Sequence, residues 1–319
     1  MFFNKSASPK TPKRRSNERR IVVITRKTRL EELLYKYNTV AQSKFYIEHL
    51  GGDFSDYQEE DTQYHYAVSQ AIKILERIGK VHKVDRSFLP NYIFGKEDIV
   101  VAIGQDGLVA NTIKYLDGHK LLGLNPDPKR WDGVLLPFSL DNLEEGLAKA
   151  LNIGCDVKFV TLAKVELNTG EVLYGVNDIF IGPKTHQSLR YIIKHGTKQE
   201  NQSSSGIIIS TGLGSTGWFT SLMVGANAIA KPKKKRQNYA FAWDSNYLHF
   251  TVREPFPSQY SQTNIVFGKV DSAMQLSIES LMPENGVIFS DGIEQDFLEF
   301  NSGTTATITL AQKKGCLVT

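Results

Sequence analysis

The feature that most constrains the fold is the alternation of short apolar runs with amphipathic stretches in residues 21–139. The runs are short and rich in β-branched residues, as buried parallel strands are, and the stretches between them keep the apolar spacing of helices. This alternation predicts an α/β domain whose parallel sheet has right-handed crossovers. We expect strands over residues 21–24, 80–85, 98–103 and 120–124, and helices over residues 60–79 and 108–116.

The pattern changes after Ser139, which precedes one more amphipathic stretch, residues 140–151. Alternating runs separated by turn residues then predict a mainly antiparallel β domain, which one helix over about 215–230 interrupts. The expected organisation is a disordered basic tail over 1–20, an α/β domain over 21–139 and a β-rich domain over 140–319. We expect strands in the last of these over 157–160, 172–174, 179–181, 191–193, 239–243, 248–252, 264–270, 274–278, 287–290 and 304–310.

The charge of the chain is concentrated at its beginning. The 319 residues have a net charge of +4, but residues 1–20 contain seven basic residues and one acidic one, which leaves the rest at −2. The body is therefore not a basic nucleic-acid-binding surface. We expect the tail to be solvated, with a nucleic-acid arm or an organelle transit peptide as alternatives. The basic run over 231–236 is expected to be a solvated loop, or else to attract a polyphosphate.

Other features of the composition exclude several classes of protein. The longest apolar runs are far shorter than the ~18 residues of a membrane span, so no membrane association is expected. Cys155 and Cys316 cannot form a disulfide framework, and we expect reduced thiols in a cytoplasmic protein. The seven histidines have no metal-ligand spacing, so no built-in metal site is predicted.

Five polar elements stand at places where chemistry can occur. Gly104-Gln105-Asp106-Gly107 lies between a predicted strand and a helix, where backbone amides can face a phosphate and an aspartate can accept a proton or cap the helix. The segment 210–218 (STGLGSTGW) has three glycines and four hydroxyls, and is either a ligand cradle or a flexible loop. The remaining elements are an asparagine–aspartate pair in an apolar strand, a rigid loop and a turn: Asn177-Asp178, 125–128 and 290–292.

These elements, in this order, resemble the NAD kinase family. The likeness is closest to the divergent mitochondrial-type NAD kinases and their bacterial relatives, and it covers about residues 20–310. GQDG stands at the family's GGDG motif, Asn177-Asp178 at its Asn-Glu pair, and 210–218 at its second glycine-rich loop. The further carriers are Thr28-Arg29, Tyr35-Lys36-Tyr37, 125–130 (NPDPKR), Ser204-Ser205-Gly206, Arg253-Glu254-Pro255, and Asp291-Gly292 with Phe297, Glu299 and Phe300.

The resemblance implies transfer of a phosphoryl group from Mg-ATP, or from polyphosphate, to the 2′-hydroxyl of the adenosine ribose of NAD. It implies that Asp106 is the base, that Mg²⁺ comes with the ATP, and that the chain forms a homodimer or homotetramer. The implied donor-phosphate loop is Gly104, Gln105 and Gly107. The implied NAD-binding residues are Asn125, Asn177, Asp178, Ser205, Thr211, Gly214, Thr216, Gly217 and Ser221.

The chain departs from the family pattern at the donor loop. Gln105 replaces the second glycine and Leu108 stands at a usual threonine. If that glycine needs a positive φ, glutamine costs on the order of 1 kcal/mol and blocks the donor phosphates. A catalytically weak or inactive NAD(P)-binding regulator is therefore an alternative function. A lipid or sugar kinase is another, because diacylglycerol and sphingosine kinases and phosphofructokinases share the GGDG element.

Overall fold

The computed structural model describes residues 19–152, 156–230 and 238–319. Residues 1–18 of the expected tail, Cys155 and the basic run 231–236 lie outside the described residues. No helix among the described residues is long and apolar enough to span a membrane.

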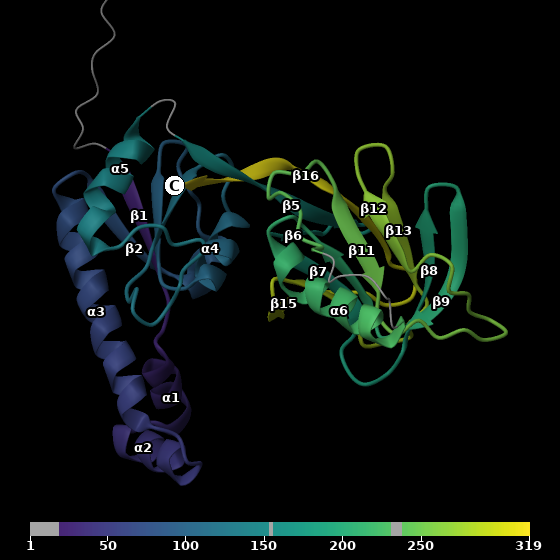
Figure 1. Ribbon diagram of the computed structural model, residues 1–319, viewed down its shortest axis with the longest axis horizontal. Coiled ribbons are helices and arrows are strands. Elements are labelled where there is room, and N and C mark those ends of the chain that lie inside the picture. Colours follow the sequence, from purple (N-terminus) through teal and green to yellow (C-terminus); the bar gives the residue numbers. More distant parts are fainter. Residues whose placement is uncertain (1–18, 153–155, 231–237) are drawn as a thin grey trace, which may run out of the picture.

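Two sheets organise the chain, one mixed and one antiparallel (Figure 1). The order of strands in the mixed sheet is β2 (Lys80–Asp85), β1 (Arg20–Thr25), β3 (Ile99–Ile103), β4 (Lys120–Leu124), β16 (Thr305–Val318), β13 (Leu276–Ser280), β8 (Leu189–His195), β9 (Lys198–Ser204). Strand β5 (Val157–Leu167) also pairs with β16, and β6 (Val172–Gly175) pairs with β5. The antiparallel sheet runs β12 (Phe267–Val270), β11 (Leu248–Val252), β10 (Ile207–Ser210), β7 (Asp178–Pro183), β14 (Gly286–Ser290), β15 (Ile293–Glu299).

The expected fold class is confirmed. Strands β1 to β4 pair in parallel, and the strands of the second sheet pair antiparallel throughout. Alternate residues of β1 face opposite sides: Ile21 and Val23 pack under α3 (Phe54–Glu76) and α5 (Leu143–Leu151), while Val22 and Ile24 pack under α4 (Asp106–Ile113). This is the two-sided burial that a parallel sheet requires.

The long strand β16 joins the two parts of the chain. Its first residues pair with β13 and β5, and near its end Cys316 and Leu317 pair with β4, so the C-terminus lies with the N-terminal strands (Figure 1). Helix α5 also packs there, with Leu143 and Leu147 beside Val318 in one apolar cluster. Helix α5 and the end of β16, which both follow residue 139, thus pack on and pair with the first four strands.

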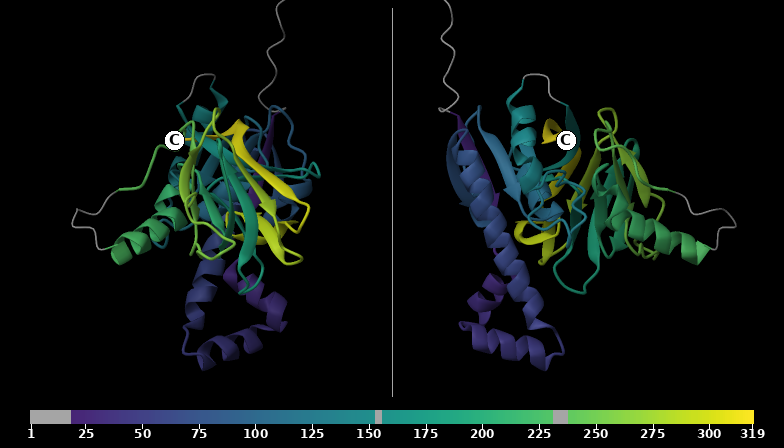
Figure 2. Two further views of the ribbon diagram at one scale, coloured as in Figure 1. Left: turned by 90° about the vertical axis from the view of Figure 1, so that its right-hand side faces the viewer. Right: turned by 60° about the vertical axis from the view of Figure 1, so that its left-hand side comes forward.

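Two helices that the sequence analysis did not predict project from the body. Helices α1 (Arg29–Tyr37) and α2 (Val40–His49) stand with the first half of α3 below the sheet (Figures 1 and 2). They have a small core of their own, formed by Leu30, Ile47 and Phe54. The signal for α1 is in the sequence, because Thr28 and Glu31 form a capping box, with an exchange of side chain-to-backbone hydrogen bonds.

The strand predictions are mostly confirmed, with three corrections in the second half. Residues 239–243 form no strand, and aromatic packing of Phe241 against Phe219 accounts for their apolar character. The strand expected over 264–270 begins only at Phe267, and the strand expected over 274–278 is displaced to Leu276–Ser280.

We predict that Leu147→Ala destabilises the whole fold by roughly 2–5 kcal/mol, because Leu147 is fully buried where α5 meets the first sheet. Urea denaturation measures this loss. The half-exposed Leu281→Ala is the control and should cost well under ~1 kcal/mol. An equally small loss at Leu147 would contradict the docking of α5 on this sheet.

Candidate active site

The donor loop begins where β3 ends, at the carboxyl edge of the parallel sheet. Gly104 is buried, and a Cβ built on it would lie 3.0 Å from Cδ2 of Leu108, so a side chain here would crowd the start of α4. Gln105 has a φ of −115°, an extended conformation that any residue adopts. The expected cost of glutamine at this position is therefore wrong. Leu108 is 3% exposed and packs in the apolar core beneath the loop.

Asp106 is the first residue of α4 and is partly exposed. Its carboxylate accepts hydrogen bonds from the backbone N–H of Leu135, at 2.8 Å, and of Val134, at 3.2 Å. The cap residue of α4 is Gln105, so the alternative of Asp106 as the helix cap is wrong. Asp106 instead faces the loop that follows β4.

Asn125 opens that loop and is buried. Its amide donates to the carbonyl of Trp131 at 2.8 Å, and its side-chain oxygen accepts from the N–H of Asp127 at 3.0 Å. Both ends of the side chain therefore hold the loop that carries the two N–H donors to Asp106.

The glycine-rich loop packs on the turn that contains Asn177. The Thr211 hydroxyl donates to the carbonyl of Val176 at 2.5 Å and accepts from the N–H of Gly214 at 3.2 Å. A Cβ on Gly214 would lie 2.0 Å from the carbonyl oxygen of Asn177, and one on Gly212 would lie 1.9 Å from that of Ala242. These two glycines are needed because backbone segments pack closely there.

The exposed part of this loop is its end. Thr216 and Gly217 are exposed, as is Ser221 one turn later, at the start of α6 (Trp218–Ala230). The N–H of Ser221 donates to the carbonyl of Gly217 at 3.1 Å. Ser205 lies apart from these residues, at the opposite end of β10, where its N–H donates to the carbonyl of Arg253.

One apolar cluster brings the donor and glycine-rich loops together. It contains Leu108 of α4, Leu135 of the loop that binds Asp106, Val176 beside Asn177, and Leu213 of the glycine-rich loop. The cluster thus joins the loop of residues 104–107, the loop that follows β4, the turn at Asn177 and the glycine-rich loop, with Ser205 as the outlying member of the predicted site.

Buried charges lie behind Asn177. The carboxylate of Asp291 accepts from the N–H groups of Val176, Asn177 and Asp178 at 2.6–3.3 Å, and Nζ of Lys114 lies 3.5 Å from it. Burial raises the pKa of Asp291, while Lys114 and the N–H groups lower it. Burial, together with the charge of Asp291, raises the pKa of Asp178 to about 7.

An aromatic pocket opens on the outer face of the antiparallel sheet, two residues along β7 from Asp178. Its volume is about 280 Å³. The guanidinium of Arg253 lies over the rings of Trp218 and Phe180, and Nζ of Lys184 lies over Phe297. Sequence reasoning missed this pocket as a site, although aromatic residues at matching positions of neighbouring strands signal it. It is lined by Phe180, Pro183, Lys184, Trp218, Arg253, Val287, Phe289, Glu294 and Phe297.

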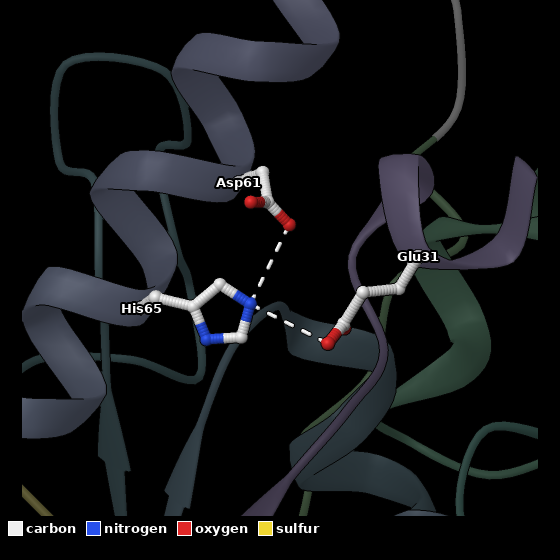
Figure 3. A group of neighbouring side chains, drawn as sticks. All are labelled: Glu31, Asp61 and His65. Carbon is white, nitrogen blue, oxygen red and sulfur yellow. Dashed lines mark ion pairs between the residues drawn. The ribbon is translucent and has the colours of Figure 1, made fainter. Parts of the chain in front are cut away.

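A third group of polar side chains lies between α1 and α3 (Figure 3). Nε2 of His65 is 3.4 Å from a carboxylate oxygen of Glu31 and 3.4 Å from one of Asp61. Glu31 also accepts from the N–H of Thr28, and Asp61 accepts from its hydroxyl at 2.5 Å. These bonds attach the capped start of α1 to α3, and they account for the group without a metal ion.

Solved structures show which fold this is. An NAD kinase from Archaeoglobus fulgidus, in complex with ATP, is similar with a TM-score of 0.57 and 15% identity, over 94% of this chain and 93% of its own. Yeast NADH kinase, complexed with NADH, is similar with a TM-score of 0.57 and 13% identity, over 95% of this chain and 84% of its own. The chain has the fold of the NAD kinases. No protein-family model and no curated protein matches the sequence.

The raised pKa of Asp178 predicts a pH dependence of stability. Between about pH 4 and 7 the unfolded chain has lost the Asp178 proton while the folded protein still binds it. The free energy of unfolding therefore falls as the pH rises. Asp178→Asn removes the titration, and its free energy of unfolding should decline less across this window, by about 2–4 kcal/mol. Urea denaturation at several pH values tests this. Asp141→Asn, at an exposed carboxyl, should keep the wild-type slope, and an unchanged slope in Asp178→Asn would exclude the assignment.

Proposed function

We propose that this protein is an NAD kinase-like phosphotransferase, which transfers a phosphoryl group from ATP or polyphosphate to the 2′-hydroxyl of the adenosine ribose of NAD and so forms NADP. The observation that carries the proposal is the position of Asp106. It stands partly exposed at the start of α4, the helix whose Leu108 shares an apolar cluster with Leu213 of the glycine-rich loop, in a chain with the fold of the NAD kinases.

The start of α4 suits the donor phosphates. Among the described residues, the N–H groups of Gln105, Asp106 and Gly107 have no protein acceptor. Apart from its chain neighbours and the backbone of α4, no heavy atom lies within 4 Å of a Cβ built on Gly107. Free amides at a helix start bind anions. Phosphoryl transfer depends on alignment and charge neutralisation, so these amides, a Mg²⁺ that enters with ATP and one base form a sufficient set.

The second sheet suits the dinucleotide acceptor. Asn177, Thr216 and Gly217 would hold the adenosine side near Asp106, since they lie at the end of β7 and β10 that faces the donor loop. The aromatic pocket with Arg253 and Lys184 would take the other half, because aromatic faces stack on planar rings and cations attract a pyrophosphate. The yeast protein of similar fold was solved with NADH.

A regulator that binds NAD(P) without turnover is the alternative. One argument for it, backbone strain at Gln105, is lost because the φ of Gln105 is negative. Its other arguments, the Gln105 side chain beside the donor phosphates and the missing threonine hydroxyl at Leu108, are decided by the NADP assay below. A homodimer or homotetramer remains part of the proposal, since the edge strands β12 and β15 of the second sheet could be covered by another subunit.

The direct test is incubation with NAD and MgATP, or with NAD and polyphosphate, followed by measurement of NADP. We predict that wild type forms NADP and that Asp106→Asn lowers kcat by ~10²–10⁴-fold with little change in NAD affinity, because the amide cannot accept the proton. Asp141→Asn is the matched control, at an exposed aspartate outside the site.

Two results would contradict the proposal. If wild type binds NAD and forms no NADP with either donor, the protein is a regulator. If Asp106→Asn keeps more than about a tenth of the wild-type kcat, the proton goes to another group.

A further inference from the structure

Arg26 lies directly against the donor loop. It follows β1, whose Ile24 pairs with Ala102 of β3, so Arg26 and Gly104 leave adjacent parallel strands at the same edge. Nε of Arg26 is 3.5 Å from the position of a Cβ on Gly104. The guanidinium therefore occupies the side of the loop on which Gly104 has no side chain.

One donor of this guanidinium has no partner. The NH2 group pairs with Glu60 at 2.7 Å and the NH1 group donates to the carbonyl of Lys27 at 2.9 Å. Nε is buried with no acceptor, and the side chain is 9% exposed. It is the only charged group among the buried unpartnered side-chain atoms of the described residues. A buried donor without an acceptor is rare, because its lost hydration is not replaced.

Helix α3 fixes Arg26 in this position through two residues one turn apart. Glu60 is 3% exposed and pairs with Arg26 on one carboxylate oxygen and with Arg29, at 2.7 Å, on the other. The hydroxyl of Tyr64 accepts from the N–H of Arg26 at 2.9 Å and donates to the carbonyl of Ile103 at 3.0 Å. Its ring lies under the guanidinium, with 5.0 Å from Cζ to the ring centroid. Both the side chain and the backbone of Arg26 are thus held before any ligand binds.

We propose that Arg26 is a donor-binding residue whose Nε–H donates to an oxygen of the donor's phosphate chain, alongside the free amides of residues 105–107. This inference rests on the proposed function and names a group outside the glycine motif that recognises the donor. The chemistry recognised is a phosphoanhydride chain, which ATP and inorganic polyphosphate share. A guanidinium N–H suits such an anion, because charge-assisted hydrogen bonds to phosphate oxygens are stronger than neutral ones.

Binding of a phosphate oxygen to Nε of Arg26 also requires a small movement of the loop. Nε is shielded from solvent, so the phosphate chain reaches it only if Gly104 or Gln105 shifts. Gly107 permits such a shift at its end of the loop, since the space around its Cβ position is open.

The test compares Arg26→Met with Arg29→Met. Each variant removes one of the two arginines that pair with Glu60, and Arg29 also pairs with Asp56, so both variants break the same ion-pair network. Only Arg26 lies against Gly104. We expect Arg26→Met to weaken binding of MgATP and of inorganic tripolyphosphate by roughly 10- to 100-fold, as measured by calorimetry. The KM for the donor should rise accordingly, with the KM for NAD within about 2-fold of wild type. Arg29→Met should stay within about 3-fold for every constant.

Arg26→Lys covers the case in which the methionine variant does not fold, since lysine keeps the charge beside Glu60 and lacks the Nε–H. It should still weaken tripolyphosphate binding by at least about 5-fold. Unchanged tripolyphosphate binding in a folded Arg26 variant would overturn the inference. Equal losses of binding in the Arg26→Met and Arg29→Met variants would also overturn it. Wild type that binds tripolyphosphate in an Arg26-dependent way but forms no NADP would disprove the proposed function and support this inference. Wild type that binds neither MgATP nor tripolyphosphate would disprove both.

Discussion

The candidate site depends on one buried carboxylate, that of Asp291. Its residue has a φ of +56°, and its side chain takes up the three consecutive N–H groups of the turn at Val176, Asn177 and Asp178. Lys114 lies beside it and donates to Ser290. Without this acceptor, the three buried N–H groups and the Lys114 ammonium would lose their hydration and have no carboxylate partner. Removal of one partner of a buried ion pair typically costs about 3–5 kcal/mol.

This interaction couples the two halves of the molecule. Lys114 directly follows α4, whose other end carries Asp106, and Asp291 lies at the turn between β14 and β15 of the antiparallel sheet. The C-terminal end of α4 is thus attached, through Lys114 and Asp291, to the start of β7 at Asp178. Tyr64 and Glu60 fix the donor side from the opposite direction, through Arg26 and Ile103. Contacts near both ends of this short helix therefore fix the position of the loop that carries Asp106.

Local patterns in the sequence predicted the elements that carry the site. The strand before Gly104, the helix after it and the helix after the glycine-rich loop are visible in the apolar spacing alone. The contacts between them were not predictable, because Lys114 and Asp291 are far apart in the chain and neither belongs to a periodic pattern. The unstrained Gln105 shows why a motif comparison misleads: replacing a glycine matters only where φ is positive or space is short.

The role of the Lys114–Asp291 pair is tested most directly by a double-mutant cycle. Lys114→Met, Asp291→Asn and the double variant are compared by urea denaturation, and asparagine suits position 291 because it tolerates a positive φ. We predict that the double variant is less destabilised than the sum of the single variants by about 1–3 kcal/mol, since each single change leaves a buried partner unpaired. Additivity within about 0.5 kcal/mol would contradict the account, because the two residues would then stabilise the chain independently.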